Sequence, residues 1–184
     1  TIGPDVSEMR RGEEDEVEAL LLAAFSGPDE AALVRRLRAE GAMMSERVMR
    51  WRGRIGAYAG ISRMAAPAGW FCLAPVAVLP EWQGGALAQD PRMRHYFRLG
   101  TVIVRQTAGM FIEFPHAIRW TQGTDLVPTL VVLGKPSFYA RCGFSQERAA
   151  RLTSPFPLEY TLIARPGTDV PEAALAYPAA FGAP

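Results

Sequence analysis

The stretch Leu130–Phe144, "LVVLGKPSFYARCGF", decides the fold because it joins a buried strand to a very short helix. Its opening run of apolar residues is typical of a strand that is covered on both faces. A Gly-Lys-Pro break follows, and proline suits the first turn of a helix. Gly143 is placed to end that helix. The sequence thus predicts Tyr139 on a brief helical turn at the mouth of a strand, where it serves either packing or chemistry.

The composition is that of a soluble globular protein. The chain has 184 residues, which suits one domain over 1–184, and 49% of them are hydrophobic while 21% are charged. A formal net charge of +1 gives no support for nucleic acid as a partner. No stretch approaches the roughly 18 apolar residues of a membrane span, and the first residues lack an apolar signal-peptide core. We therefore expect a cytoplasmic protein that engages neither a membrane nor nucleic acid.

The cysteine and histidine residues do not indicate a metal site. Cys72 and Cys142 are far apart in the sequence and fit no metal-ligand spacing, while His95 and His116 stand alone. A free cysteine is most often a small buried hydrophobic residue, so we expect both cysteines in the core. No metal is predicted.

A short strand and two helices are predicted at the start of the chain. The segment 7–11 (SEMRR) favours a short strand. Glu13–Phe25 has acidic residues in its first turn, where the helix dipole favours them, and apolar residues at helical spacing. A second helix opens at Pro28 with two acidic residues, and Gly41 can end it.

The rest of the sequence predicts a mixed α/β fold. Arg47–Trp51 and Ile55–Met64 are strands joined at Gly53, which can take a positive φ. After a turn at 65–69, Trp70–Pro80 is almost continuously apolar, so this last strand of an antiparallel meander should be central and covered on both faces. Later strands are predicted over Val127–Leu133 and Leu158–Arg165.

A loop that suits phosphate follows the central strand. Residues 80–88 read PEWQGGALA, which places glycines after a buried strand and ahead of a helix. Backbone N–H groups with no Cβ in front of them, together with the helix dipole, bind anions in such loops. Taken alone, QGGA is a weak signal for phosphate binding and favours an ordinary surface turn.

Two ordered motifs resemble a known family. The segments 74–85 (APVAVLPEWQGG) and 131–144 (VVLGKPSFYARCGF) are similar to the fourth strand, and to the fifth strand with the turn after it, in the GNAT superfamily of acyl-CoA-dependent N-acyltransferases. The bacterial branch of this family also resembles the first helices and the ending ALAYPAAF at 174–181. The resemblance covers most of the chain except about 89–125.

The resemblance implies both a fold and an activity. The fold is α/β, with a central mixed, mostly antiparallel sheet flanked by helices and a splay between the fourth and fifth strands. The activity is transfer of an acetyl group from acetyl-CoA to an amine of a small molecule or peptide. Sheets of this kind commonly form homodimers through exposed strands.

The resemblance also implies which residues hold acetyl-CoA. In the family the fourth strand offers its backbone to the pantetheine arm, which here falls to Pro75, Val76, Ala77 and Val78.

The family's pyrophosphate loop, Q/R-x-x-G-x-G/A, can be aligned in two ways. In the first, Gln83 fits the first position, and Gly84 and Gly85 fill the variable ones. Ala86 then stands where the first required glycine should be, and Ala88 fills the last position.

In the second alignment the segment 97–106 (FRLGTVIVRQ) supplies the loop glycine. Gly100 and Thr101 then lie at the start of a helix that begins near Arg98 or Gly100, because Pro91 disfavours a helix from residue 86. Cations in the intervening stretch would either neutralise the phosphates or lie on a solvated basic loop; they are Arg92, Arg94 and Arg98.

By the same resemblance, Tyr139 stands beside the sulfur of acetyl-CoA and acts as the general acid. A thiolate that leaves a thioester needs a proton, and a phenol with a pKa near 10 can supply it. Ser137 and Phe138 would line the same slot. The alternative is a packing tyrosine whose hydroxyl is bound to the backbone.

The sequence does not identify a general base. Glu81, Glu113, His116 and Asp125 are candidates by position, and none is assigned. The aromatic segment 110–125 either shapes an acceptor pocket or belongs to the core. An alternative function is a non-catalytic module of the same fold with weakened or lost CoA binding, because the loop glycine is replaced.

Overall fold

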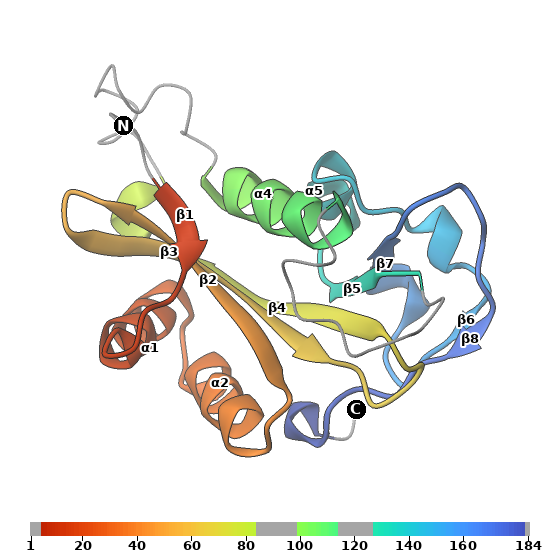
Figure 1. The fold of residues 1–184 in the computed structure, drawn as a ribbon, viewed down its shortest axis with the longest axis horizontal. Coiled ribbons are helices and arrows are strands. Elements are labelled where there is room, and N and C mark those ends of the chain that lie inside the picture. Colours follow the sequence, from red (N-terminus) through yellow and green to blue (C-terminus); the bar gives the residue numbers. More distant parts are fainter. Residues whose placement is uncertain (1–4, 84–98, 114–126, 183–184) are drawn as a thin grey trace.

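A computed structural model describes residues 5–83, 99–113 and 127–182, and within them the main sheet has six strands in the order β1-β2-β3-β4-β5-β7 (Figure 1). These strands are β1 (Asp5–Glu8), β2 (Met43–Trp51), β3 (Arg54–Arg63), β4 (Trp70–Val78), β5 (Thr129–Leu133) and β7 (Thr161–Ala164). Only β4 and β5 pair in parallel, and the other neighbours are antiparallel. A small parallel pair is formed by β6 (Leu152–Thr153) and β8 (Ala173–Ala174).

The helices cover both faces of the main sheet. They are α1 (Glu14–Ala24), α2 (Asp29–Ala39), α4 (Leu99–Glu113) and α5 (Pro136–Arg141), with short 3-10 turns η1 (Pro80–Trp82), η3 (Glu147–Ala149), η4 (Leu158–Tyr160) and η5 (Ala179–Phe181). In Figure 1, α1 and α2 lie on one face, and α4 with α5 lies on the other. Both α1 and α4 contact β4, so this apolar strand is covered on both faces, as predicted. The predicted mixed α/β fold is confirmed.

The two N-terminal helices follow from their sequences. In α1 the first turn is acidic, and Val17, Leu20 and Leu21 form one buried face at helical spacing. In α2 the buried residues are Ala31, Val34 and Leu37, and basic residues occupy the last turn. Both helices therefore bury an apolar face against the sheet.

The β2–β3 hairpin forms at the predicted glycine, but β2 is longer than predicted. Arg52 and Gly53 both have positive φ, as a tight two-residue hairpin requires. We expected β2 to begin at Arg47, whereas it begins at Met43. The polar residues Ser45 and Glu46 obscured this start, yet both have partners. Ser45 donates a hydrogen bond to a carboxylate oxygen of Glu8 at 2.7 Å, and Glu46 accepts one from Tyr58 at 2.8 Å.

Further strand boundaries differ from the predictions: β4 ends at Val78 and not at Pro80, and β5 begins at Thr129 and not at Val127. The first strand was placed at 7–11, but β1 ends at Glu8 and the chain turns at Gly12, whose φ is +97°. The last strand was placed at Leu158–Arg165, but its first three residues form the turn η4, and only Thr161–Ala164 pair with β5. The Tyr160 N–H donates to the Pro157 carbonyl at 3.2 Å, which closes this turn, so β7 starts only after it.

The C-terminal segment runs back across the molecule from β7 to α2. Ala176 pairs with Ala66 in the turn between β3 and β4. Leu175 and Tyr177 join a second hydrophobic cluster with residues of β4, β5 and β7. At the end of this path the Arg36 guanidinium donates two hydrogen bonds to the Ala180 carbonyl.

Candidate active site

Strands β4 and β5 separate after a short shared stretch. Their paired residues run only from Trp70 with Thr129 to Cys72 with Val131, while β4 continues to Val78 beside β3. The β3–β4 register shifts between Ala59 and Ile61, which marks a β-bulge opposite the middle of β4. Bulges bend a strand and increase its twist. The two parallel strands therefore diverge, and this is the predicted splay.

The backbone of β4 beyond the bulge faces the splay at alternate residues. The Leu79 N–H donates to the Gly56 carbonyl at 2.8 Å, so Leu79 faces β3. Because backbone direction alternates along a strand, Ala77 also faces β3, whereas Val76 and Val78 face the side of β5. A peptide-like group inserted in the splay would meet the backbone N–H and C=O of Val76.

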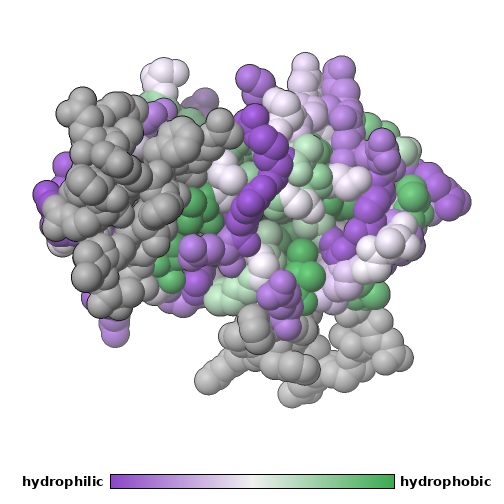
Figure 2. Space-filling view, turned by 90° about the horizontal axis from the view of Figure 1, so that it is seen from above, coloured by the Kyte–Doolittle hydropathy of each residue, from purple (hydrophilic) through white to green (hydrophobic). Residues whose placement is uncertain are grey.

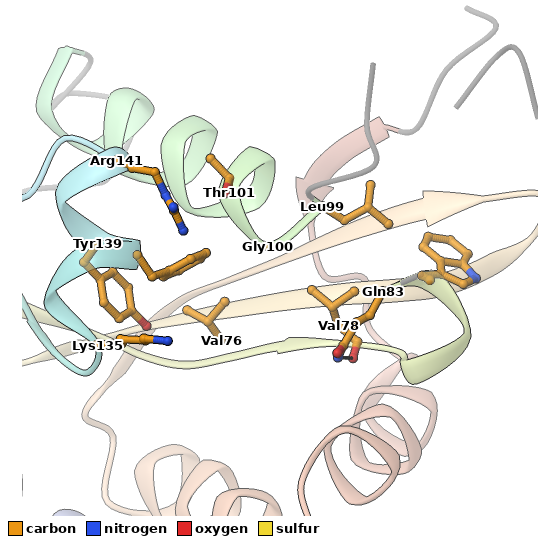
Figure 3. Close-up of a pocket in the computed structure, with 11 residues that line it drawn as sticks. Val76, Val78, Gln83, Leu99, Gly100, Thr101, Lys135, Tyr139 and Arg141 are labelled. Carbon is orange, nitrogen blue, oxygen red and sulfur yellow. Dashed lines mark hydrogen bonds between the residues drawn. The ribbon is translucent and has the colours of Figure 1, made fainter. Parts of the chain in front are cut away.

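A cleft of about 540 Å³ opens at this splay (Figure 3). Its walls are the end of β4, the first turn of α4, and α5. The lining residues are Val76, Val78, Trp82, Gln83, Leu99, Gly100, Thr101, Lys135, Phe138, Tyr139 and Arg141. Three segments far apart in the sequence thus meet around one space, and no aspartate or glutamate is among these described lining residues.

The structure brings many of the predicted site residues together around this cleft. Those lining it are Val76, Val78, Gln83, Gly100, Thr101, Phe138 and Tyr139. Ala77 is instead buried in the core, and Ser137 is exposed and is not a lining residue. The remaining loop predictions lie outside the described residues; they are Gly84, Gly85, Ala86, Ala88, Arg92, Arg94 and Arg98.

The first turn of α4 forms one wall of the cleft. Its described part begins at Leu99, and the residues before it lie outside the described residues, so the helix start expected near Arg98 or Gly100 stays a prediction. A methyl group at Gly100 would lie 3.5 Å from Phe138 and 3.7 Å from Val78, so the helix passes close to both α5 and β4. The first turn holds no acidic residue. Backbone N–H groups at such a helix start favour an anion.

Gln83 closes the end of β4. Its side-chain amide donates to the Val78 carbonyl at 2.7 Å (Figure 3), and its backbone N–H donates to the Pro80 carbonyl at 3.1 Å. The neighbouring Trp82 is buried over Gly56, where any Cβ would lie about 2.0 Å from the indole ring. The turn after β4 is thereby fixed against the sheet.

Tyr139 lies on α5 beside the splay. Its ring makes edge-to-face contacts with Phe138 and Phe144, at centroid distances of 4.9 and 5.8 Å. Burial, with smaller contributions from Cys72 and Cys142, raises the pKa of Tyr139 to about 12. Among the described residues none accepts a hydrogen bond from its hydroxyl. The phenol is therefore protonated at neutral pH, and its proton is not committed to the described backbone.

Two cations that the sequence reading missed also line the cleft. Lys135 precedes α5 and Arg141 ends it, and Figure 3 shows the Arg141 side chain pointing from α5 into the cleft beside α4. Neither side chain forms an ion pair with a described residue. Arg105 on α4 donates to the Arg141 carbonyl, at 2.8 Å from Nε, which ties α5 to α4. The signal for both cations was their position flanking the tyrosine motif.

The candidate bases do not converge on the cleft. Glu81 is exposed and lies 3.4 Å from the Arg54 guanidinium. Glu113 is exposed at the far end of α4. His116 and Asp125 lie outside the described residues. Among the described residues no three histidine, cysteine, aspartate or glutamate side chains are grouped to hold a metal ion, and both cysteines are free and buried.

The described surface on this side of the molecule is mixed in character. Seen from above, hydrophilic side chains lie next to hydrophobic ones that remain visible between them (Figure 2). In the part of the chain that the structure describes, no helix combines the length and apolarity that a membrane span requires.

Known structures share this architecture. A GNAT family N-acetyltransferase of Escherichia coli in complex with CoA aligns with a TM-score of 0.76 at 20% identity, over 98% of this chain and 93% of that chain. A GNAT family acetyltransferase of Brucella melitensis in complex with acetyl-CoA aligns with a TM-score of 0.68 at 23% identity, over 98% and 99%. The ribosomal-protein-S18-alanine N-acetyltransferase of E. coli gives 0.54 at 12% identity, over 90% and 95%.

The two other comparisons with known proteins found nothing. No family model matches the sequence, and no match to a curated protein was found. The structural likeness nevertheless extends over nearly the whole chain, including the splayed strands that bound the cleft. The chain therefore has the fold of the GNAT N-acetyltransferases.

Proposed function

We propose that the protein is an N-acetyltransferase that moves an acetyl group from acetyl-CoA to the amine of a small molecule or peptide. The observation that carries the proposal is the meeting of the β4 splay, the α4 start and Tyr139 around one cleft. Two structures of this fold hold CoA or acetyl-CoA. The chemistry of each wall matches one part of such a cosubstrate.

Each wall has a proposed role in binding. The backbone of Val76 would pair with the amide groups of the pantetheine arm, because it faces the splay and not β3. The α4 start, around Gly100 and Thr101, would hold the pyrophosphate through backbone N–H groups. Lys135 and Arg141 would add positive charge, and none of the described lining residues is acidic to offset it.

Tyr139 would act in the chemical step. The amine nitrogen forms a bond to the thioester carbon, the C–S bond breaks, and the sulfur leaves with the electron pair. Tyr139 donates its proton to that sulfur and regains one from solvent, while the new amide nitrogen loses its proton. A phenol with a pKa raised to about 12 remains protonated below that pH, so it can donate throughout the neutral range.

A thiol-release assay tests the proposal. Purified protein and acetyl-CoA would be mixed with a panel of primary amines: a linear polyamine, a peptide containing a lysine side chain, and a peptide with a free N-terminal alanine. We expect at least one amine to raise CoA release above the amine-free rate, with an acetylated product of the expected mass. Weak or absent acetyl-CoA binding, together with no transfer to any amine, would instead support the non-catalytic module.

A further inference from the structure

Gly134 lies directly after β5 and joins that strand to α5. Its backbone N–H donates to the Tyr160 carbonyl at 2.9 Å, so its position is fixed by the neighbouring chain. Unlike Gly143, whose φ is +95°, Gly134 does not have a left-handed φ. An L-amino acid could adopt its backbone conformation. The absence of a side chain here therefore needs another reason.

That reason is the ring of Tyr139. A Cβ at Gly134 would lie 2.5 Å from Cε2 of the tyrosine ring, 3.2 Å from Cδ2 and 3.5 Å from Cζ. The first distance is far below van der Waals contact, so a methyl group would displace the ring, the backbone or both. The ring edge thus occupies the space that a side chain at residue 134 would fill.

A displacement of the Tyr139 ring would also displace its hydroxyl group. Cε2 is bonded to Cζ, which carries the hydroxyl, so pushing on Cε2 also shifts the hydroxyl. Phe138 and Phe144 hold the ring edge to face, and the Tyr139 N–H and carbonyl are engaged within the α5 turn. Gly134 leaves space for the edge of the ring that lies next to the end of β5.

We propose that Gly134 is a positioning residue for Tyr139, which sets where the phenol stands in the splay. This inference rests on the proposed function, because it acts through the general acid. It explains why the chain has glycine, and not another strand-ending residue, between β5 and α5. Because Gly134 directly follows the last residue of β5, the end of this strand also determines where the Tyr139 ring lies.

The chain offers a matched glycine-to-alanine control. At Gly109 on α4 a methyl group would meet nothing within 4 Å, and its φ is not left-handed. Gly109→Ala therefore repeats the chemical change without the clash.

The first test needs no acceptor amine. Protein labelled with carbon-13 at tyrosine Cζ would be titrated with base, and the Tyr139 signal assigned by its absence in Tyr139→Phe. In wild type we expect a titration near the raised pKa of about 12. Gly134→Ala should lower the pKa of Tyr139, because the displaced ring is less buried, while Gly109→Ala should leave it unchanged. An unaltered signal and pKa in folded Gly134→Ala would overturn the inference.

The second test is a double-mutant cycle on transfer, with acetyl-CoA and the most active amine of the panel. We expect Gly134→Ala to lower kcat about tenfold or more, a change of ~1.4 kcal/mol in the barrier. The Kd for acetyl-CoA should change less than about threefold, because Gly134 does not line the cleft. A threefold change in Kd is well below the tenfold change that ~1.4 kcal/mol would cause. In the Tyr139→Phe background, where no hydroxyl remains to be misplaced, the same substitution should change kcat less than about twofold.

The outcomes separate the inference from the function. Equal loss of kcat in both backgrounds would show that Gly134 acts on the fold alone, and would overturn the positioning role while leaving the enzyme in place. Transfer that is insensitive to Tyr139→Phe would remove the acid role itself. Absence of both cofactor binding and transfer in wild type would refute the proposed function.

Discussion

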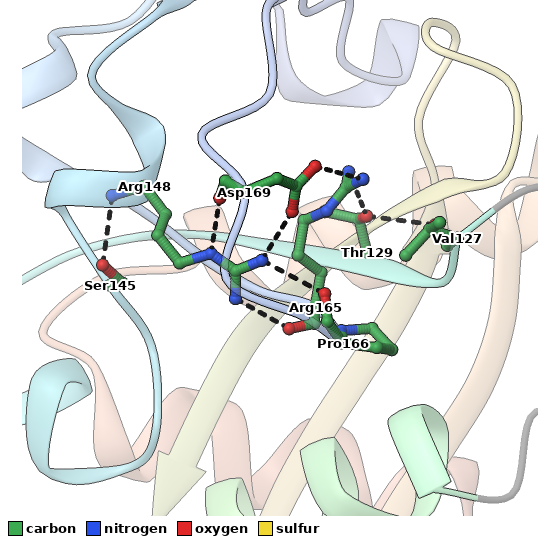
Figure 4. Close-up of polar contacts among 7 residues, drawn as sticks. All are labelled: Val127, Thr129, Ser145, Arg148, Arg165, Pro166 and Asp169. Atoms are coloured by element: carbon green, nitrogen blue, oxygen red, sulfur yellow. Dashed lines mark hydrogen bonds and ion pairs between the residues drawn. The ribbon is translucent and has the colours of Figure 1, made fainter.

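The cleft at the splay and the cluster around Arg148 both gather positive charge, but they use it in opposite ways. In the cluster, the Arg148 guanidinium donates to three backbone carbonyls and to the Asp169 carboxylate, and Arg165 bonds Asp169 and Thr129 (Figure 4). In the cleft, Lys135 and Arg141 form no ion pair with a described residue. Cations that the chain itself satisfies stabilise the fold, whereas cations with no ion-pair partner among the described residues can bind a ligand.

The two regions also differ in what holds them. The cluster ties η3 to the segment after β7, so it fixes the start of the C-terminal path. The cleft is bounded by β4, α4 and α5, and no ion pair between described residues crosses it. Substitutions in the first region should change stability with little effect on binding, and substitutions in the second should do the reverse.

The largest effect is expected at the acid. Tyr139→Phe keeps the ring and its contacts with Phe138 and Phe144, but removes the proton donor. We expect kcat to fall by about 10²–10⁴, with the acetyl-CoA dissociation constant unchanged within about twofold. Steady-state rates and calorimetry on the same preparation measure both. Equal loss of rate and of binding would count against the acid role and would make Tyr139 a packing residue.

The next effect concerns the cluster. Arg148→Met leaves the carbonyls of Asp169, Arg165 and Pro166 without their donor. Because most of the Arg148 side chain is buried, we expect the free energy of unfolding to fall by about 2–3 kcal/mol, and Tm by roughly 5–10 °C.

The matched control for this substitution is Arg151→Met. Its guanidinium pairs with Glu172 on the open surface, with side-chain exposures of 61% and 72%, so its loss should leave Tm nearly unchanged. If Arg148→Met instead weakened acetyl-CoA binding and spared Tm, the division between the two regions would be wrong.

A smaller effect is expected at Arg141. Arg141→Gln removes a cation from the cleft without breaking an ion pair to a described residue. We expect the Kd for acetyl-CoA to rise about tenfold, since one charge-assisted hydrogen bond contributes about 1.5–3 kcal/mol. Tm without ligand should stay the same. Calorimetry at low and high salt should show a weaker salt dependence than in wild type. An unchanged Kd for acetyl-CoA in Arg141→Gln would show that Arg141 does not contact the phosphates of the bound cosubstrate.

The smallest effect is a pH dependence of stability in the cluster. The hydrogen bond from Arg148, with help from Arg165, lowers the pKa of Asp169 below its usual 3.8. A carboxyl with a lowered folded pKa stabilises the fold above its unfolded pKa and loses that contribution as pH falls through the folded value. The Tm of wild type should therefore decline more than that of Asp169→Asn as the pH falls below the usual carboxyl pKa of 3.8. Parallel declines would show that the carboxylate contributes nothing.

The sequence predicted the parts of the fold that depend on local pattern. Buried faces at helical spacing located α1 and α2, and continuous apolarity identified β4 as a strand covered on both faces. It missed the early start of β2, because Ser45 and Glu46 are polar and their hydrogen-bond partners lie on other strands. These partners are Glu8 on β1 and Tyr58 on β3. Partners distant in sequence decide whether a polar residue can lie in a strand.

The candidate site divides in the same way. The motif around Tyr139 and the glycine at residue 100 were found from the sequence, and both line the cleft. Lys135 and Arg141 were missed because a charged residue in a loop motif carries no local sign of which way it points. Ser137 and Ala77 were assigned by motif position, and the turn of α5 and the pleat of β4 direct them away from the cleft.

The central claim is that the cleft binds acetyl-CoA, and a calorimetric titration of the wild-type protein tests it most directly. We expect one cosubstrate per chain with a dissociation constant on the order of micromolar, a rise in Tm with added cosubstrate, and weaker binding in Arg141→Gln. No heat and no thermal shift at millimolar acetyl-CoA would contradict the claim, and the shared fold would then serve a different ligand.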